Sequence, residues 1–431
     1  MDGIKGILTP PDADEVEITL IGGTAGYGES VVVHLGNGVW AVVDSCVNAF
    51  NGDCAPLSYL KEFYKEEEVA NHLKYVVCTH WHEDHIKGMT KLIDACSRQA
   101  VFVLSCADDR EKYIYEMLEG CEYTGSSRKL KELSDSMDLA NRKSISIKRV
   151  EQDKMIFNIE GVQCFALSPS PQEIEKFEQE IANALLTYHK SLVQISQLKT
   201  IDPAKIEDAE DIEGSVIEKF AGLISEKIDE EPISSEKVDN LLSYKDAHGV
   251  EPNERCVAML LSFNGHHVIL GADLEYDESK SPESGWQSVA NCDCLHDVEA
   301  NLFKIPHHGS HTGYYKYFID KYIKSDAVSK LSSWYLGGYT LPKHDMLVRY
   351  FGHSKNLYIT TTSLLGKKNK EKDKTIRGIM NDTTEEIHEF KPTLGIIRSR
   401  MKKTAIEDMW QTVCFGSAQK IEKEYLDSIN D

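Results

Sequence analysis

The six residues His80-Trp81-His82-Glu83-Asp84-His85 place three imidazoles and two carboxylates in one short stretch. They directly follow residues 73–78, an apolar run that predicts a short buried strand. Neutral imidazole combined with carboxylate is a donor set that suits Zn²⁺, Mn²⁺ or Fe²⁺ better than Ca²⁺ or Mg²⁺. The alternative is a polar loop whose histidines bond to backbone carbonyls. Because these histidines and carboxylates cluster at a strand end, a metal site is favoured over a polar loop, and the fold of the chain must accommodate that site.

Two distant segments carry further metal-ligand chemistry. Residues 267–275 predict a strand that delivers Asp273 just past a glycine, and a carboxylate there can bridge two ions. Residues 302–311 predict a strand that ends in the adjacent imidazoles of His307 and His308. Taken alone, Asp273 could cap a turn and the histidines could lie on the surface. Together with the first motif, the segments predict one shared metal site.

In chain order, these residues resemble the metallo-β-lactamase fold hydrolases. More narrowly, the chain is similar to the hydrolase domain of ComEC-type competence proteins and its free-standing relatives. The narrower resemblance also uses four short segments: Gly28-Glu29-Ser30, Val43-Asp44-Ser45, Leu167-Ser168-Pro169 and Leu341-Pro342-Lys343-His344. It spans roughly residues 16–170 and 250–365. The resemblance implies an α/β fold, the αββα sandwich.

The resemblance also implies two divalent ions, Zn²⁺ or Mn²⁺, about 3.5–4 Å apart, which would hold a hydroxide as nucleophile. The implied metal ligands are His80, His82, Asp84, His85, Asp273 and His308. His80 and His82 would face one ion, and Asp84 and His85 would turn toward the other. Either His307 or His308 could be the ligand, and His308 is favoured because family members place the ligand directly before a glycine.

Three residues receive implied catalytic roles. Asp84 would orient the hydroxide, while His307 or His344 would protonate the leaving oxygen or bind the phosphate. For His344 an exposed loop position is the alternative. Asp44 would support the histidine cluster from outside. The chain departs from full-site family members at Ser168-Pro169-Ser170, where those members have a third histidine, so the ion at His80 and His82 would lack one protein ligand.

The predicted organisation has two halves of the metallo-β-lactamase fold, 1–170 and 250–431, separated by a helical insertion at 171–249. Apolar residues spaced by three or four within 174–195 predict the first helix of that insertion. A basic loop is predicted near 366–378. Strands are predicted at 16–21, 30–35, 39–43, 73–78, 100–105, 145–150, 155–159, 162–167, 256–263, 267–270, 394–401 and 410–415, with helices at 57–68 and 89–96.

Composition restricts the setting. No apolar run approaches the eighteen residues of a membrane span, and the N-terminus lacks a signal-peptide pattern, so no membrane association is expected. The cysteines number 11, an odd count, and none form a CxxC pair; the closest two, Cys292 and Cys294, match no common zinc motif. We expect a cytoplasmic protein with reduced thiols.

The leading functional hypothesis is a dinuclear metal-dependent phosphodiesterase or nuclease acting on DNA, RNA or a nucleotide. A net charge of −22 argues against broad electrostatic binding of DNA and favours a smaller substrate, or a partner protein that supplies the nucleic-acid contacts. One alternative is hydrolysis of a non-phosphate ester or lactone-type bond. Another is a non-catalytic interaction subunit that binds a protein partner through 171–249.

Overall fold

The computed structural model describes residues 8–22, 28–48, 51–107, 128–176, 252–336, 339–362, 394–406 and 409–428. Two mixed sheets of eight strands each form its centre, and a two-stranded ribbon accompanies them. The predicted insertion at 171–249 lies almost entirely outside the described residues, as does the predicted basic loop at 366–378. Of the described helices, none is long and apolar enough to cross a membrane.

The first sheet combines strands from both ends of the chain. Its order is β17 (Gln411–Gly416), β16 (Gly395–Lys402), β1 (Glu15–Gly22), β2 (Glu29–Gly36), β3 (Val39–Val43), β4 (Leu73–Val77), β5 (Val101–Ser105) and β6 (Ser146–Val150). Strands β3 to β6 run parallel, whereas the strands from β17 to β3 pair antiparallel. The C-terminal strands therefore complete the sheet that the N-terminal strands begin.

In chain order, the second sheet starts directly after β6, at the point where the first sheet's parallel strands end. Its order is β18 (Gln419–Lys420), β15 (Leu357–Ile359), β12 (Ile323–Leu331), β11 (Ala300–Lys304), β10 (His266–Leu270), β9 (Met259–Phe263), β8 (Val162–Ala166) and β7 (Met155–Ile159). Strands β10, β11, β12 and β15 are parallel. The ribbon consists of β13 (Trp334–Leu336) and β14 (Tyr339–Leu341).

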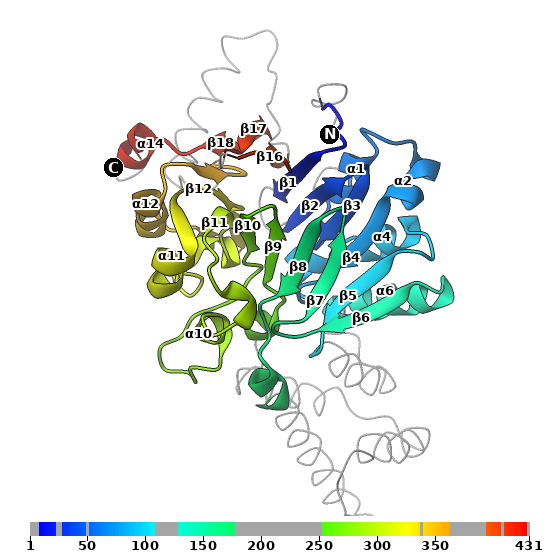
Figure 1. Ribbon diagram of the computed structural model, residues 1–431, viewed down its shortest axis with the longest axis horizontal. Coiled ribbons are helices and arrows are strands. Elements are labelled where there is room, and N and C mark those ends of the chain that lie inside the picture. Colours follow the sequence, from blue (N-terminus) through cyan, green and yellow to red (C-terminus); the bar gives the residue numbers. More distant parts are fainter. Residues whose placement is uncertain are drawn as a thin grey trace, which may run out of the picture.

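Helices cover the outer face of each sheet (Figure 1). On the first sheet these are α1 (Ala55–Leu60), α2 (Glu66–His72), α3 (Glu83–Ile86), α4 (Met89–Ala95) and α6 (Arg128–Arg142). On the second side lie α10 (Gly285–Val289), α11 (Lys316–Tyr322), α12 (His344–His353) and α14 (Lys423–Ser428). Short 3₁₀ turns are η2 (Pro252–Arg255), η3 (Asp293–Leu295) and η4 (His307–Gly309). Where one helix was predicted at 57–68, the chain instead forms α1 and α2, separated by residues 61–65.

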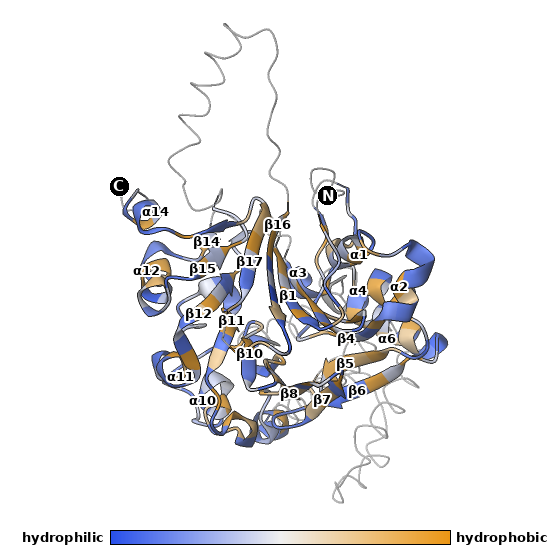
Figure 2. Cartoon of the chain, turned by 45° about the horizontal axis from the view of Figure 1, so that its top comes forward, coloured by the Kyte–Doolittle hydropathy of each residue, from blue (hydrophilic) through white to orange (hydrophobic). Residues whose placement is uncertain are grey.

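Strand periodicity explains the layering. In β2, Val31 and Val33 join the apolar cluster between the two sheets, while Val32 joins the cluster under the helices. Successive side chains of a strand point to opposite faces, so a strand buried on both faces reads as a continuous apolar run. Trp286 and Phe303 belong to a third cluster, between the second sheet and its helices. Figure 2 shows the hydrophobic residues concentrated along the strands. The predicted αββα sandwich is confirmed.

The parallel strands of both sheets deliver their following residues to one edge. Val43 of β3 pairs with Val77 of β4, and Leu270 of β10 pairs with Lys304 of β11. Residues that follow aligned strand ends therefore meet at the same edge, the usual place for a site in open α/β sheets.

Candidate metal centre

Four side chains from three strand ends converge at this edge. The ligand atoms of Asp84, His85, Asp273 and His308 all lie within 4.8 Å of one another. His85 Nε2 is 3.1 Å from Asp273 Oδ2, and His308 Nε2 is 3.2 Å from Asp84 Oδ2 and 3.6 Å from Asp273 Oδ2. All but the partly exposed Asp84 are buried. Of the adjacent histidines, the structure thus brings His308 into the cluster.

Unusual backbone conformations aim these ligands. Ala272, His307 and His308 have φ of 46°, 45° and 51°, in the left-handed region that disfavours side chains other than glycine. Gly28 has φ of 81°, and a Cβ there would lie 1.7 Å from the carbonyl oxygen of Asp84. The glycine of the Gly28-Glu29-Ser30 segment is therefore required by the close approach of the loop that carries Asp84.

Asp44 fixes the orientation of His85. Its carboxylate accepts hydrogen bonds from the backbone N–H of Thr79 at 2.7 Å, from the Thr79 hydroxyl at 2.7 Å and from His85 Nδ1 at 2.8 Å. Burial raises the pKa of Asp44, while these donors lower it. Because Nδ1 of His85 donates to Asp44, Nε2 is the nitrogen that faces Asp273. Such a carboxylate behind a histidine is typical of metal ligands.

A second buried chain of contacts orients His308. Its Nδ1 lies 2.9 Å from the hydroxyl of Ser332, and that hydroxyl donates to Glu29. Glu29 also forms an ion pair with Lys304, whose ammonium donates to the carbonyl of Ala272 at 2.8 Å. Burial lowers the pKa of Lys304, but the carboxylates of Glu29 and Asp273 outweigh it and raise that pKa overall. The cluster therefore has a fixed cation beside it.

His80 and His82 form a neighbouring pair of donors. His80 Nε2 and His82 Nδ1 are 3.1 Å apart, and the ring centroids of His80 and His85 are 4.3 Å apart. Burial and the nearby His85 and His82 lower the pKa of His80 well below its ordinary value. His80 is therefore neutral, the state in which an imidazole can bind a metal. Within the described residues, this pair belongs to no group of three close ligand atoms.

The cluster fits a divalent transition metal. Asp273 Oδ1 and His85 Nε2 are buried, and neither makes a hydrogen bond of good geometry among the described residues, although His85 Nε2 forms an ion pair with Asp273 Oδ2 at 3.1 Å. Such atoms are costly to bury unless another group binds them. Burial raises the pKa of Asp273, yet the imidazoles of His85 and His308 lower it well below its usual range overall, so the carboxylate is charged. Nitrogen donors and charged oxygens together suit Zn²⁺ or Mn²⁺.

His307 occupies a different position from His308. Its side chain is 22% exposed, and Nδ1 pairs with Glu275 at 2.8 Å while Nε2 lies 3.4 Å from Nδ2 of Asn253. Burial lowers the pKa of His307, but Glu275 outweighs it and raises the pKa overall. His307 can therefore hold a proton at the mouth of the cluster.

Two other predicted positions have partners elsewhere. His344 begins α12, and its Nε2 lies 3.0 Å from the carbonyl oxygen of Leu426 in α14. The structure does not bring it into the cluster. In the segment 168–170, where the resemblance would place a third histidine, the hydroxyl of Ser168 donates to the carbonyl of Cys256 at 2.6 Å and accepts from the N–H of Ala258 at 3.0 Å.

Sequence reasoning missed the support of His308 by Ser332 and Lys304. A serine after a strand gives no distinctive signal. Lys304, in contrast, interrupts the apolar run of 302–305, and a charged residue inside a predicted buried strand was a usable sign of a buried ion pair.

Comparisons with known proteins give distant structural likenesses. No protein-family model matches the sequence, and no curated protein matches it. The metallo-beta-lactamase fold protein YhfI from Bacillus subtilis is similar at a TM-score of 0.30 and 14% identity, over 68% of this chain and 70% of that one. Zn(2+)-bound PqqB from Methylobacterium extorquens is similar at 0.29 and 10%, over 67% and 71%. The hydrolase AbOPH in the beta lactamase superfamily is similar at 0.25 and 16%, over 38% and 66%. The αββα architecture itself rests on the two sheets and their covering helices.

Proposed function

We propose that the chain is a metal-dependent hydrolase, and that its substrate is a phosphodiester of a nucleotide or nucleic acid. The observation that carries the proposal is the buried cluster of Asp84, His85, Asp273 and His308, in which Asp273 Oδ1 has no hydrogen-bond partner among the described residues. A purely structural site closes all its positions with protein ligands, whereas here the partly exposed Asp84 keeps one side open.

A divalent cation at these ligands would supply Lewis-acid activation of an ester oxygen and of water at neutral pH. The chain's residues would position the reacting groups around it. Asp84 would accept a hydrogen bond from the attacking water. His307 would donate a proton to the leaving oxygen, because Glu275 keeps its imidazole protonated. Asp44 and Ser332 would hold the histidine ligands in place.

An aromatic edge beside the cluster supports a nucleotide substrate. The rings of Trp334 and His308 are stacked with centroids 6.5 Å apart, and Trp334 meets Tyr339 edge-on at 6.4 Å. Tyr339 is 52% exposed, and the ammonium of Lys343 lies 3.8 Å from its ring centroid. An exposed ring with a nearby cation suits a base and its phosphate. The net charge of −22 favours a nucleotide or short strand over long duplex DNA.

A substrate panel tests the proposal. Purified protein with Mn²⁺ or Zn²⁺ is incubated with bis-p-nitrophenyl phosphate, dinucleotides, single- and double-stranded DNA, RNA, a lactone and a thioester. We expect turnover of the diesters, lost in the double variant His82→Ala, Asp84→Ala. The matched control is His353→Ala, whose imidazole bonds the carbonyl of Ile323 outside the cluster. Turnover of the lactone or thioester alone would exclude a phosphodiesterase, and equal activity in both variants would exclude the cluster.

A further inference from the structure

A second group of metal-ligand atoms lies away from the His/Asp cluster and shares no residue with it. Asp153, in the turn between β6 and β7, meets Cys292 and Cys294, which flank the start of η3. One ligand atom from each of these residues lies within 4.8 Å of the others. Cys292 is buried, and the other two are partly exposed.

Contacts from distant segments hold these three side chains together. A carboxylate oxygen of Asp153 accepts the backbone N–H of Cys294 at 3.0 Å, across 141 positions of sequence. Gln152 donates through Nε2 to the sulfur of Cys292 at 3.1 Å. The Cys292 thiol in turn donates to the carbonyl of Leu167 at 3.3 Å. Contacts with distant segments thus position the carboxylate of Asp153, the sulfur of Cys292 and the backbone of Cys294.

The two thiols disfavour each other's charge. The hydrogen bond with Cys294 and burial raise the pKa of Cys292. A bound cation would reverse this effect, because a metal ligand thiol loses its proton. Within the described residues, an acidic side chain, that of Asp153, lies in the same close group as the two thiols. The arrangement is therefore suited to a cation shared by three anionic donors.

Two sulfurs and one carboxylate oxygen are ligands for a borderline-soft ion. Zinc binds sulfur at about 2.3 Å and carboxylate oxygen at about 2.0–2.2 Å in tetrahedral geometry. Ligand atoms within 4.8 Å of one another can reach such an ion with small side-chain adjustments. The His/Asp cluster contains no sulfur, so thiophilic ions distinguish the two groups.

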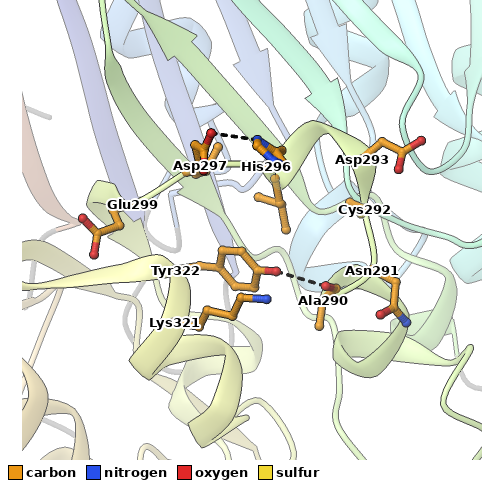
Figure 3. A pocket seen from close by; sticks show the side chains of 11 residues that line it. Ala290, Asn291, Cys292, Asp293, His296, Asp297, Glu299, Lys321 and Tyr322 are labelled. Carbon is orange, nitrogen blue, oxygen red and sulfur yellow. Dashed lines mark hydrogen bonds and ion pairs between the residues drawn. The ribbon is translucent and has the colours of Figure 1, made fainter.

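The group is open to solvent on one side. Cys292 lines a pocket of about 630 Å³, and Figure 3 shows it on the pocket wall together with Asp293, His296 and Tyr322. Asp153 and Cys294 do not line this pocket but are themselves partly exposed, so an ion can reach the group from solvent and a solvent molecule can take the fourth position. His296 is highly exposed, pairs with Asp297 at 2.8 Å and stands two residues after Cys294.

We propose that Asp153, Cys292 and Cys294 bind Zn²⁺ at a site separate from the hydrolytic centre. The ion would tie the turn between β6 and β7, where the chain passes from one sheet to the other, to the segment that leads into β11. The proposal does not depend on the hydrolase function.

Cobalt substitution tests this site. Full-length protein reconstituted with Co²⁺ should show a near-ultraviolet sulfur-to-cobalt charge-transfer band, which the His/Asp ligands cannot produce. The double variant Cys292→Ser, Cys294→Ser should lose the band and one bound ion per chain. The variant Asp84→Ala, His308→Ala and the control Cys96→Ser should keep the band. Absence of the band in the unsubstituted protein, or its survival in the double cysteine variant, would refute the site.

Thiol protection provides a test that needs no variant. We expect Zn²⁺ to slow alkylation of Cys292 and Cys294 at least tenfold, with mass spectrometry of the peptides as the readout, while the rate at the partly exposed Cys414 stays unchanged. Equal alkylation rates with and without Zn²⁺ would refute the site. It would also be refuted if Cys292 and Cys294 formed a disulfide and the protein still bound no Zn²⁺ at this site after reduction.

Discussion

Lys330 links the two sheets through a buried amine. It lies in β12 of the second sheet, is fully buried, and donates to the carbonyls of Ile18 in β1 and, at 3.0 Å, of Ile397 in β16 of the first sheet. A neutral amine has two N–H groups, which match these two acceptors, whereas an ammonium has a third donor. Burial lowers the pKa of Lys330 to about 7, although the charge of Glu17 opposes the shift.

This pKa makes the free energy of unfolding depend on pH in a defined direction. In the unfolded chain the pKa of a lysine is 10.5, so between pH 7 and 10.5 the unfolded state binds more protons than the folded state. Stability therefore rises with pH over that window. The whole difference corresponds to roughly 5 kcal/mol, at about 1.4 kcal/mol per pH unit. Because Lys330 is half protonated near pH 7, the gain between pH 7 and pH 9 is about 2 kcal/mol.

Urea unfolding of the wild-type protein and Lys330→Met measures this contribution. The variant loses two hydrogen bonds at every pH, so only the change of the difference with pH reports ionisation. We expect the wild type to gain about 2 kcal/mol relative to Lys330→Met between pH 7 and pH 9. The control Lys402→Met removes a lysine that is 57% exposed, and its difference from wild type should stay constant. Parallel pH profiles for wild type and Lys330→Met would refute a neutral buried amine.

Three further predictions concern the metal centre. Asp44→Asn should weaken Zn²⁺ or Mn²⁺ binding about 10- to 100-fold, because the substitution removes the carboxylate that orients His85. Competition with a chromogenic chelator measures the affinity, and an unchanged affinity would contradict an orienting role of Asp44. His307→Ala should lower diesterase turnover about 100-fold or more with metal content unchanged. The activity of the wild type should fall as pH rises through the raised pKa of His307, and the variant should not show this fall. A variant whose activity still falls at alkaline pH would exclude His307 as the acid. Burial lowers the pKa of His85, but Asp273 and Asp44 outweigh burial and raise that pKa overall. Metal binding near neutral pH should therefore release a proton from His85, and the affinity for metal should increase as pH rises. Calorimetric heats that are identical in buffers of different ionisation enthalpy would argue against proton release.

The sequence predicted the αββα sandwich and residues that the structure brings together at one edge. Local clustering identified Asp84 and His85, and their position after a strand indicated where they would lie. Asp273 and His308 also follow strands, and parallel strands align their carboxyl ends. Prediction succeeded there because each residue's position depends on its own strand.

The supporting contacts could not be predicted in this way. The hydroxyl of Ser332 meets Glu29 across 303 positions of sequence, and neither residue carries a spacing that relates it to the other. The catalytic role of His344, which the motif suggested, stays a prediction, because the structure places His344 at the start of α12 and outside the ligand cluster. Its packing against α14 depends on how the C-terminal helix returns to α12, which the motif does not encode.

The charges at the centre explain why a cation belongs there. Lys304 pairs with Glu29 and, at 3.9 Å, with Asp273, and this single ammonium cannot balance the carboxylates of Glu29, Asp44, Asp84 and Asp273 together. Burying carboxylates without compensation costs several kcal/mol each, more than a domain of ordinary stability can tolerate. Without metal, the imidazole of His85 holds a proton, because Asp273 and Asp44 raise its pKa despite its burial. A divalent ion bound to Asp84, His85, Asp273 and His308 would supply positive charge in place of that proton. The side chains that anchor the histidines, Asp44 and Ser332, then keep the ligands aimed in either state.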